Sequence, residues 1–235
     1  MTNRYLFCAL VGLGGCVLAG LATAAPPAPF NATYEVLQDG NPLGEATVRL
    51  TPSGDGEWTY SKQLKGTAGL AALLGANLDE RSRFRWKGNV PEAVSYDYQL
   101  EAAIKTKERH LRVDWASRQV SVDEGKGVTH YPAVAGMVER NTTALAIGAA
   151  LREHHTQFTL PVAVRQRVET QHFAVTGKET VKVPAGSFHA VRVDRTDAER
   201  GFSAWYAPER YLLPVKLSQH DGGNLTMQLV RFTAP

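Results

Sequence analysis

The chain has 235 residues, of which 43% are hydrophobic and 21% are charged, a composition typical of globular proteins that bury a sizeable core. Its 26 basic and 23 acidic residues leave a formal charge of +3. The sequence contains no block of five or more Lys or Arg residues. Because phosphate recognition needs clustered cations, this charge distribution argues against a nucleic-acid-binding protein.

The N-terminal segment has the pattern of an export signal. A single charge, Arg4, precedes an uncharged apolar run from Tyr5 to Ala25, and the Ala-Thr-Ala at residues 22–24 fits a cleavage site. These features predict a signal peptide over residues 1–24, cut after Ala24, and a periplasmic mature protein. The alternative is a retained anchor, because the apolar run is about 20 residues long, enough to cross a bilayer.

Both cysteines, Cys8 and Cys16, lie within this leader. The stretch Leu-Gly-Gly-Cys that ends at Cys16 resembles a lipoprotein box, so lipidation of this cysteine is an alternative, although the segment after it is apolar where such tethers are normally polar. Cleavage after Ala24 leaves a chain without disulfides or thiolate metal sites. We therefore expect association with a membrane only if the leader is retained or Cys16 is lipidated.

Apolar and polar residues alternate along most of the remaining chain, as in strands that bury one face. Turn residues such as Asp-Gly-Asn-Pro at 39–42 separate the alternating segments. The pattern predicts strands near residues 30–36, 46–50, 57–64, 82–86, 94–100, 111–115, 120–122, 165–176, 179–183, 188–195, 202–206, 212–219 and 225–232. Many short strands with short connections are typical of a meandering antiparallel sheet.

Two segments break the alternation and are predicted to be helices. The first, Thr67–Asn77, can be capped by Thr67 and ended by Gly75, and it is apolar nearly all round, so we expect it to be buried. The second, Asn141–Glu153, carries small residues that permit a close approach to a sheet. The predicted fold is mainly β: a strongly curved antiparallel sheet or incomplete barrel with two short helices packed on it. Residues 25–235 are expected to form a single domain, with at most a soft division near 156–161.

The sequence shows no arrangement that predicts catalysis. His154 and His155 are adjacent, so their side chains point apart and would not bind one metal; after a predicted helix they more simply complement its dipole. The other histidines are scattered, and neither H-E-x-x-H nor G-x-S-x-G occurs. We predict no catalytic residue, no metal site and no cofactor, which leaves a hydrolase of envelope glycans or lipids as the least supported function.

Two groups of residues are candidates for binding. Arg81, Arg83 and Arg85 share one face of a predicted strand, about 7 Å apart, where they could contact an anionic headgroup or the acidic patch of an envelope protein; the alternative is a solvated face with cross-strand ion pairs. Aromatic and leucine side chains could line a cavity for an acyl chain, with the first helix as a lid, or could simply form a packed core. These residues are Tyr34, Leu70, Leu73, Leu74, Phe84, Trp86, Tyr96, Tyr98 and Trp115.

The segments VPAGSFHAVRVDR, AWYAPERYLLPVKL and DGGNLTMQLVRF follow one another near the C-terminus. In this order they resemble the C-terminal half of the bacterial domain-of-unknown-function family 3108, and YEVLQDGNPLGEATVRL and LRVDWASRQV are similar to its N-terminal half. The sequence departs from the family's pattern at VERNTTALAIG, where members often carry an Asp followed by a Ser-rich helix start.

The resemblance implies an exported envelope protein with no assigned activity. The strand-rich layout is similar to that of lipoprotein-carrier folds, which suggests a non-enzymatic protein that binds an apolar or lipid-like ligand in a curved sheet. The alternative is an envelope scaffold or protein-interaction module that uses sheet edges or the arginine face.

Overall fold

The computed structural model describes residues 27–198, 201–220 and 224–234. The predicted signal peptide and Cys16 lie outside these residues. The described chain contains two helices, α1 (Gly69–Leu73) and α2 (Thr143–Arg152). Its strands are β1 (Phe30–Gln38), β2 (Asn41–Gly54), β3 (Glu57–Gly66), β4 (Asn77–Lys87), β5 (Val90–Ala102), β6 (Lys105–Asp114), β7 (Gln119–Asp123), β8 (Val128–Pro132), β9 (Val138–Glu139), β10 (Gln157–Ala163), β11 (Val168–Val183), β12 (Gly186–Arg195), β13 (Phe202–Tyr206), β14 (Pro214–Gln219) and β15 (Leu225–Thr233).

Fifteen strands of the described residues form one sheet in the order β8-β7-β6-β5-β4-β3-β2-β1-β15-β14-β13-β12-β11-β10-β9. Nearly every strand thus lies beside its neighbour in the sequence, as short connections require. The junction of β1 with β15 is different, because it joins the two ends of the chain. The first hairpin shows how local chemistry sets this order: Asp39 and Gly40 both have positive φ, 50° and 80°, which suits a two-residue turn between antiparallel strands.

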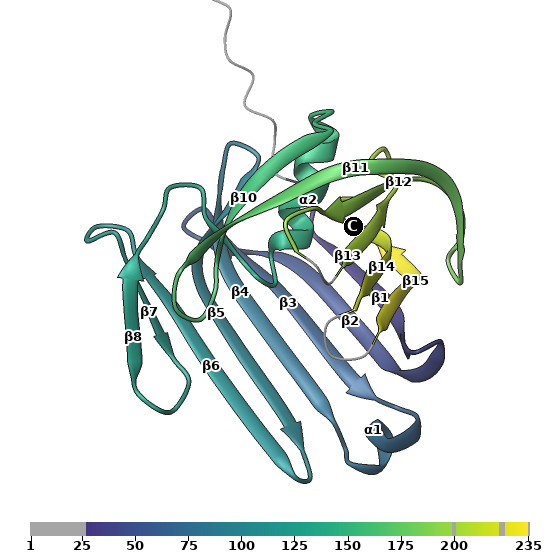
Figure 1. Cartoon of the computed structure of the whole chain (residues 1–235), viewed down its shortest axis with the longest axis horizontal. Coiled ribbons are helices and arrows are strands. Elements are labelled where there is room, and N and C mark those ends of the chain that lie inside the picture. Colours follow the sequence, from purple (N-terminus) through teal and green to yellow (C-terminus); the bar gives the residue numbers. More distant parts are fainter. Residues whose placement is uncertain (1–26, 199–200, 221–223, 235) are drawn as a thin grey trace, which may run out of the picture.

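The sheet is open and strongly curled, and its β10–β12 region folds over α2 (Figure 1). Its β9 edge returns to β5, where the amide of Ala93 donates to the carbonyl of Met137 at 2.9 Å. The pairing of β9 with β10 is parallel, whereas the other described strands pair antiparallel. The prediction of a mainly β fold with a curved sheet or incomplete barrel and two short helices is confirmed.

The course of the strands differs from the prediction in two regions. β8, β9 and β10 were not expected, and β10 runs through the stretch near 156–161 where a soft division was predicted. The turn expected at Gly177 is instead an irregularity within the 16-residue β11, where the register with β12 shifts between Val175 and Gly177. A bulge of this kind bends a strand without ending it, and β11 is visibly curved (Figure 1).

Helix α2 lies inside the curl of the sheet and joins two parts of the core. Leu145 and Ala149 belong to the hydrophobic cluster around β1–β3 and β14–β15. Ala146, Ile147 and Leu151 belong to a second cluster around β10–β13. Because apolar residues occupy opposite sides of the helix, α2 is buried nearly all round.

Helix α1 is the exception to the predicted packing. It is five residues long, begins after Ala68 instead of Thr67, and has no buried residue. Leu70 and Leu73 are 66% and 81% exposed. The expectation that this segment is buried is wrong because the helix lies at the far end of the long strands, beyond the core (Figure 1). In the described part of the chain, no helix is both long and apolar enough to span a bilayer.

Candidate ligand-binding site

An apolar cavity of about 100 Å³ lies inside the curl of the sheet, beside the first turn of α2. The hydroxyl of Tyr34, in its wall, donates to the carbonyl of Pro214 at 2.9 Å. Cavities of about 150 Å³ with aliphatic walls bind molecules such as benzene. This cavity is smaller, so it would hold only a few CH₂ groups of a ligand. Its apolar walls come mainly from β1, β2, β14 and β15: Tyr34, Val48, Leu213, Pro214, Leu217 and Met227.

The cavity opens into a wider groove. Arg140, Thr143, Phe202 and Gln219 line both the cavity and a groove of about 510 Å³. The rest of its lining is mixed, with the apolar Val162, Val164 and Phe173 beside the polar Glu169, Gln171 and Arg195. A ligand that is longer than the cavity could therefore extend into the groove without crossing the sheet.

Buried polar contacts hold the entrance to α2. Glu139 is fully buried, and its carboxylate accepts hydrogen bonds from the backbone amides of Asn141 at 2.8 Å and Thr142 at 3.0 Å. The hydroxyls of Thr142 and Thr143 donate to the carbonyl of Glu139 at 3.2 and 3.1 Å. Burial raises the pKa of Glu139, against the opposing effect of bonds from Ser82, Asn141 and Thr142. The carboxylate thus satisfies buried amides that would otherwise have no partner.

Asn141 connects this entrance to the sheet and to the cavity. Its Nδ2 donates to Ser82 Oγ at 2.9 Å and to the carbonyl of Tyr60 at 3.4 Å. Asn141 also lines the cavity. Its Oδ1 is buried and, among the described residues, has no hydrogen-bond partner. Buried acceptors in native proteins are normally satisfied, so this oxygen is an exception beside the cavity.

A row of polar side chains runs from the cavity across the inner face of the sheet. In register, Val48 of the cavity wall neighbours Lys62, then Glu80, Tyr98 and Arg109 on successive strands. Glu80 is 4% exposed and forms an ion pair with Lys62.

The pKa of Glu80 is set by competing effects. Burial by itself raises the pKa of this carboxyl. The ammonium of Lys62, the hydroxyl of Tyr96 and the charge of Arg140 act in the opposite direction and hold it below its usual value. The Tyr96 hydroxyl donates to Glu80 at 2.5 Å. Both buried carboxylates near α2 are therefore already committed to bonds within the protein.

Arg140 lies where the cavity and its surrounding grooves meet. It is exposed, although the residues on either side of it, Glu139 and Asn141, are buried. Besides the cavity and the groove of about 510 Å³, it lines a second, cationic groove of about 750 Å³. The other charged residues of this groove are Lys105, Lys107, Glu108, Arg109, Glu124, Lys126 and Arg165.

The structure does not gather the nine predicted cavity residues around one space. Tyr34 lines the cavity and Tyr98 lines the cationic groove. Four others pack within hydrophobic clusters or at their margins: Phe84, Trp86, Tyr96 and Trp115. Leu70 and Leu73 of α1 are exposed and Leu74 is half-buried. No residue of α1 lines the cavity, so the structure gives no basis for this helix as its lid.

The three arginines of β4 face away from the cavity. They alternate with Ser82 and Phe84, which are buried, so they lie on the outer, convex face. Arg83 and Arg85 both form ion pairs with Glu57, at 2.5 and 2.7 Å.

Arg81 lines a hollow of the same face with Asp79 and Asp97. The ion pairs of these arginines fit the alternative that the sequence offered, a solvated face with cross-strand pairs. This arrangement leaves these residues no contact with a ligand on the inner side.

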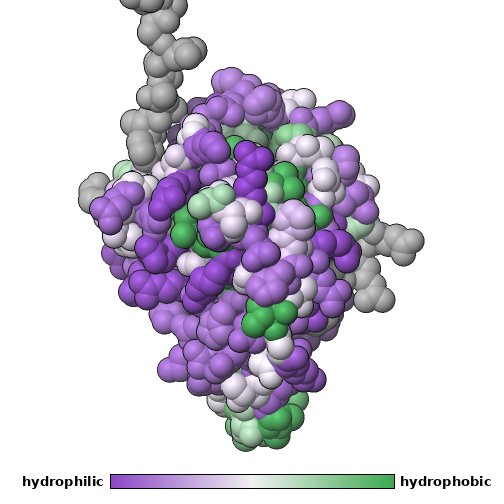
Figure 2. All heavy atoms as spheres, turned by 90° about the vertical axis from the view of Figure 1, so that its left-hand side faces the viewer, coloured by the Kyte–Doolittle hydropathy of each residue, from purple (hydrophilic) through white to green (hydrophobic). Residues whose placement is uncertain are grey.

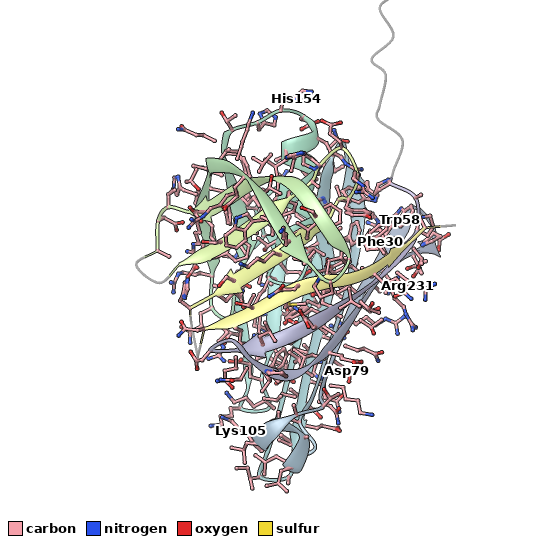
Figure 3. The ribbon with its side chains drawn as sticks, turned by 90° about the vertical axis from the view of Figure 1, so that its right-hand side faces the viewer. Phe30, Trp58, Asp79, Lys105, His154 and Arg231 are labelled. Atoms are coloured by element: carbon pink, nitrogen blue, oxygen red, sulfur yellow. The ribbon has the colours of Figure 1, made fainter. Side chains whose placement is uncertain are left out.

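The histidines do not form a site in the described residues. His154 follows α2 with a positive φ of 62° and lies at the opposite end of the molecule from Lys105 (Figure 3). His155 is within 3.5 Å of Glu153. Within residues 27–198, 201–220 and 224–234, no three His, Cys, Asp or Glu side chains are placed to hold a metal ion.

Comparison with known proteins identifies the family. The model of DUF3108, a family described as proteins of unknown function, matches residues 30–230. The chain belongs to the DUF3108 family. The predicted resemblance to this family is therefore confirmed, over almost the whole of the described sheet.

Two solved structures are similar to the DUF3108 chain. A β-barrel-like protein of the domain-of-unknown-function family DUF1849 from Brucella abortus is 10% identical, with a TM-score of 0.54; the match covers 88% of this chain and 98% of that one. A candidate lipoprotein from Parabacteroides distasonis is 9% identical, with a TM-score of 0.31, over 88% and 96% of the two chains. The first similarity shows a shared fold and nothing of function. No protein with a curated description matches the chain significantly.

Sequence reasoning missed the residues that form the cavity and its mouth. Leu213 and Leu217 lie in the strand predicted near residues 212–219 but, like Glu139 and Arg140, are not singled out as binding residues. One signal was available: these two charges interrupt the otherwise neutral stretch AVAGMVERNTTALAIGAAL. A charged pair directly before a buried helix indicates that at least one of the two charges has a specific partner.

Proposed function

We propose that the protein binds an apolar or lipid-like ligand, without catalysis, on the inner side of its curved sheet. The observation that supports this function is the apolar cavity beside α2, which opens into a longer groove. Tyr34 and Pro214 in the cavity wall bond to each other. These two polar groups therefore need no water, which favours apolar contacts on this side of the cavity.

Burial of apolar chain atoms would drive binding. Each CH₂ group removed from water contributes about 0.8 kcal/mol, before the cost of ordering the chain. About ten such groups, a few in the cavity and the rest along the groove, correspond to about 8 kcal/mol, the free energy of micromolar binding, before that cost. The hollow on the convex face is lined mainly by polar and charged side chains, which suits an apolar chain less well.

The leader sequence supports a role outside the cytoplasm. We infer that the chain is exported and that residues 25–235 form the mature, periplasmic protein. The intact mass of the protein recovered from the periplasm of an exporting host tests this directly. A mass that starts at residue 25 supports cleavage after Ala24, whereas a lipid-modified Cys16 or an uncleaved leader would contradict it.

Native mass spectrometry of residues 25–235, purified without detergent, tests the ligand. We expect a discrete added mass that is identified as a lipid after extraction, or uptake of dodecanoic acid by the ligand-free protein. A mass that stays ligand-free after incubation with envelope lipid extract would overturn the proposal.

A blocking variant connects the ligand to the cavity. Met227→Trp adds volume to a half-buried residue of the cavity wall, and we expect it to abolish loading. Val230→Trp is the matched control, because Val230 lies on the same strand and is 43% exposed. If both variants load equally well, the ligand binds elsewhere.

A further inference from the structure

We propose that the ligand is an anionic amphiphile, whose apolar chain occupies the cavity and whose charged group binds Arg140. This inference rests on the proposed function and specifies the chemical class of its ligand. Three observations carry it: the position of Arg140, the use of the nearby carboxylates, and the charge of the adjoining groove.

Arg140 lies at the mouth of the cavity. It lines the cavity with Thr143 and Ala144 and also lines both adjoining grooves. Among the described residues, its guanidinium forms no hydrogen bond or ion pair. Its positive charge lowers the pKa of Glu80, Tyr96 and Tyr98, against the effect of burial. A guanidinium offers five donors in a planar fork that suits carboxylate and phosphate groups.

The two buried carboxylates near α2 are engaged elsewhere. Glu80 forms an ion pair with Lys62 and accepts a bond from Tyr96. Both oxygens of Glu139 accept backbone amides. Neither group can turn to Arg140 without breaking buried bonds, and such a break costs about 1–3 kcal/mol for each unsatisfied group. The positive charge at the mouth is therefore available to a ligand.

The cationic groove continues the positive charge of Arg140 toward the β5–β6 end of the long strands. Besides Arg140 it contains five Lys or Arg residues and two carboxylates, Glu108 and Glu124. Glu124 is shared by Arg109 and Arg165, at 2.6 and 3.1 Å. Lys105, at the end of this groove, lies at the lower end of the molecule in Figure 3. A groove with more cations than anions attracts anionic ligands and raises their association rate.

The cavity wall also contains a polar position beside Arg140. Asn141 Oδ1 is buried without a partner among the described residues, and Asn141 lines the same cavity. A carboxylate or phosphodiester head has no hydrogen to donate to this oxygen, so the preference of the site for an anion rests on Arg140.

The test compares ligands with one chain and different heads: dodecanoate, dodecyl phosphate and dodecanol, by isothermal titration calorimetry on residues 25–235. We expect both anions to bind at least tenfold more tightly than dodecanol. Inorganic phosphate, which has no chain, should not compete. A preference for dodecyl phosphate over dodecanoate would indicate a phospholipid-like head, and the reverse a free fatty acid; either preference supports an anionic ligand.

The variant Arg140→Gln should remove this preference. We expect it to weaken dodecanoate binding about tenfold and to leave dodecanol binding unchanged. Arg49→Gln is the control, because Arg49 is an exposed arginine on the convex face and its loss changes the net charge equally. The thermal unfolding midpoint should stay the same in Arg49→Gln and fall only slightly in Arg140→Gln, because the charge of Arg140 helps to stabilise the buried carboxylate of Glu80.

The outcomes separate the two proposals. Equal binding of dodecanoate and dodecanol, or equal losses in Arg140→Gln and Arg49→Gln, would overturn the anionic ligand and leave apolar binding in place. If none of the three chains binds, the proposed function itself fails.

Discussion

Gly148 of α2 packs directly against the backbone of Leu212, so closely that a Cβ atom at Gly148 would lie 1.8 Å from the Leu212 carbonyl oxygen. This contact brings the helix onto the segment that leads into β14. It therefore also places the first turn of α2 beside Leu213 and Pro214 of the cavity wall. The absence of a side chain at Gly148 thus allows α2 to lie this close to the wall of the cavity.

The variant Gly148→Ala should destabilise the protein by about 1–3 kcal/mol, because the added methyl group overpacks a buried contact. The sign of the change in stability is informative, since Ala in a helix interior is otherwise favoured over Gly by about 1 kcal/mol. Urea denaturation measures the change. Gly177→Ala in β11 is the control: its methyl group would meet only Arg192 Cβ, at 4.0 Å, and equal losses in both variants would contradict the explanation.

Glu139→Gln should show a pH-dependent effect on stability. Burial raises the pKa of Glu139 in the folded protein, so its protonated form is favoured by folding. Its contribution is fully present below the unfolded pKa of about 4.5 and is lost as the pH rises through the folded pKa. The variant, which cannot titrate, should be less stable by about 1–3 kcal/mol at low pH because one buried amide loses its acceptor.

The free energies of unfolding of both proteins, measured between pH 4 and pH 7, test this sign. The difference in favour of the wild type should narrow as the pH rises. Glu45→Gln, at an exposed residue of β2, provides the comparison. A difference that widens with pH would show that Glu139 is stabilising as a buried charge.

Lys62→Met should destabilise the protein by about 2–3 kcal/mol, because Glu80 would remain buried without its cation. The estimate lies below that for a fully buried pair because Lys62 is 25% exposed. The double variant Lys62→Met/Glu80→Gln should recover part of the loss. Lys65→Met, at an exposed position of the same strand, should change the free energy of unfolding by less than about 0.5 kcal/mol; similar losses in both single variants would refute a specific role for the pair.

Leu73→Ala in α1 should change stability by less than about 0.5 kcal/mol, because its side chain is 81% exposed. Leu145→Ala in α2, whose leucine is fully buried, should cost about 2–5 kcal/mol. Thermal unfolding distinguishes the two cases. A large loss for Leu73→Ala would mean that α1 is buried in solution, as its apolar sequence suggests.

At the end of the molecule that contains α1, apolar side chains are exposed although the sequence pattern predicts that they are buried. Leu70, Leu73 and Ile104 are strongly exposed, and α1 is joined to the β5–β6 turn by a bond from the Ala103 amide to the Leu74 carbonyl at 2.9 Å. Apolar atoms gather at this end of the surface (Figure 2). The apolar composition of α1 predicts burial, but the segment connects strands that extend beyond the core, so nothing covers it within the described chain.

Alternation was sufficient to predict which residues of β1, β2 and β4 face the core, because side chains of a strand point to opposite faces in turn. Phe30, Ala32, Tyr34 and Val36 are all buried as expected, and Asp39–Gly40 turns the chain as the sequence indicates. The short β9 has only two residues, too few for any period to be visible, and the bulge in β11 keeps a strand continuous through a residue that usually signals a turn.

The sequence by itself determined the mainly β fold, the family and the two helical segments, because these depend on local periods and on turn chemistry. Only the tertiary structure decided that Arg140 stands at a cavity formed by Tyr34, Val48, Leu217 and Met227. Tyr34 and Val48 lie in the first strands of the chain and Leu217 and Met227 in the last, and the pairing of β1 with β15 brings them together. The degree of curl of the sheet, which no local pattern encodes, then sets whether their apolar side chains meet or leave a space.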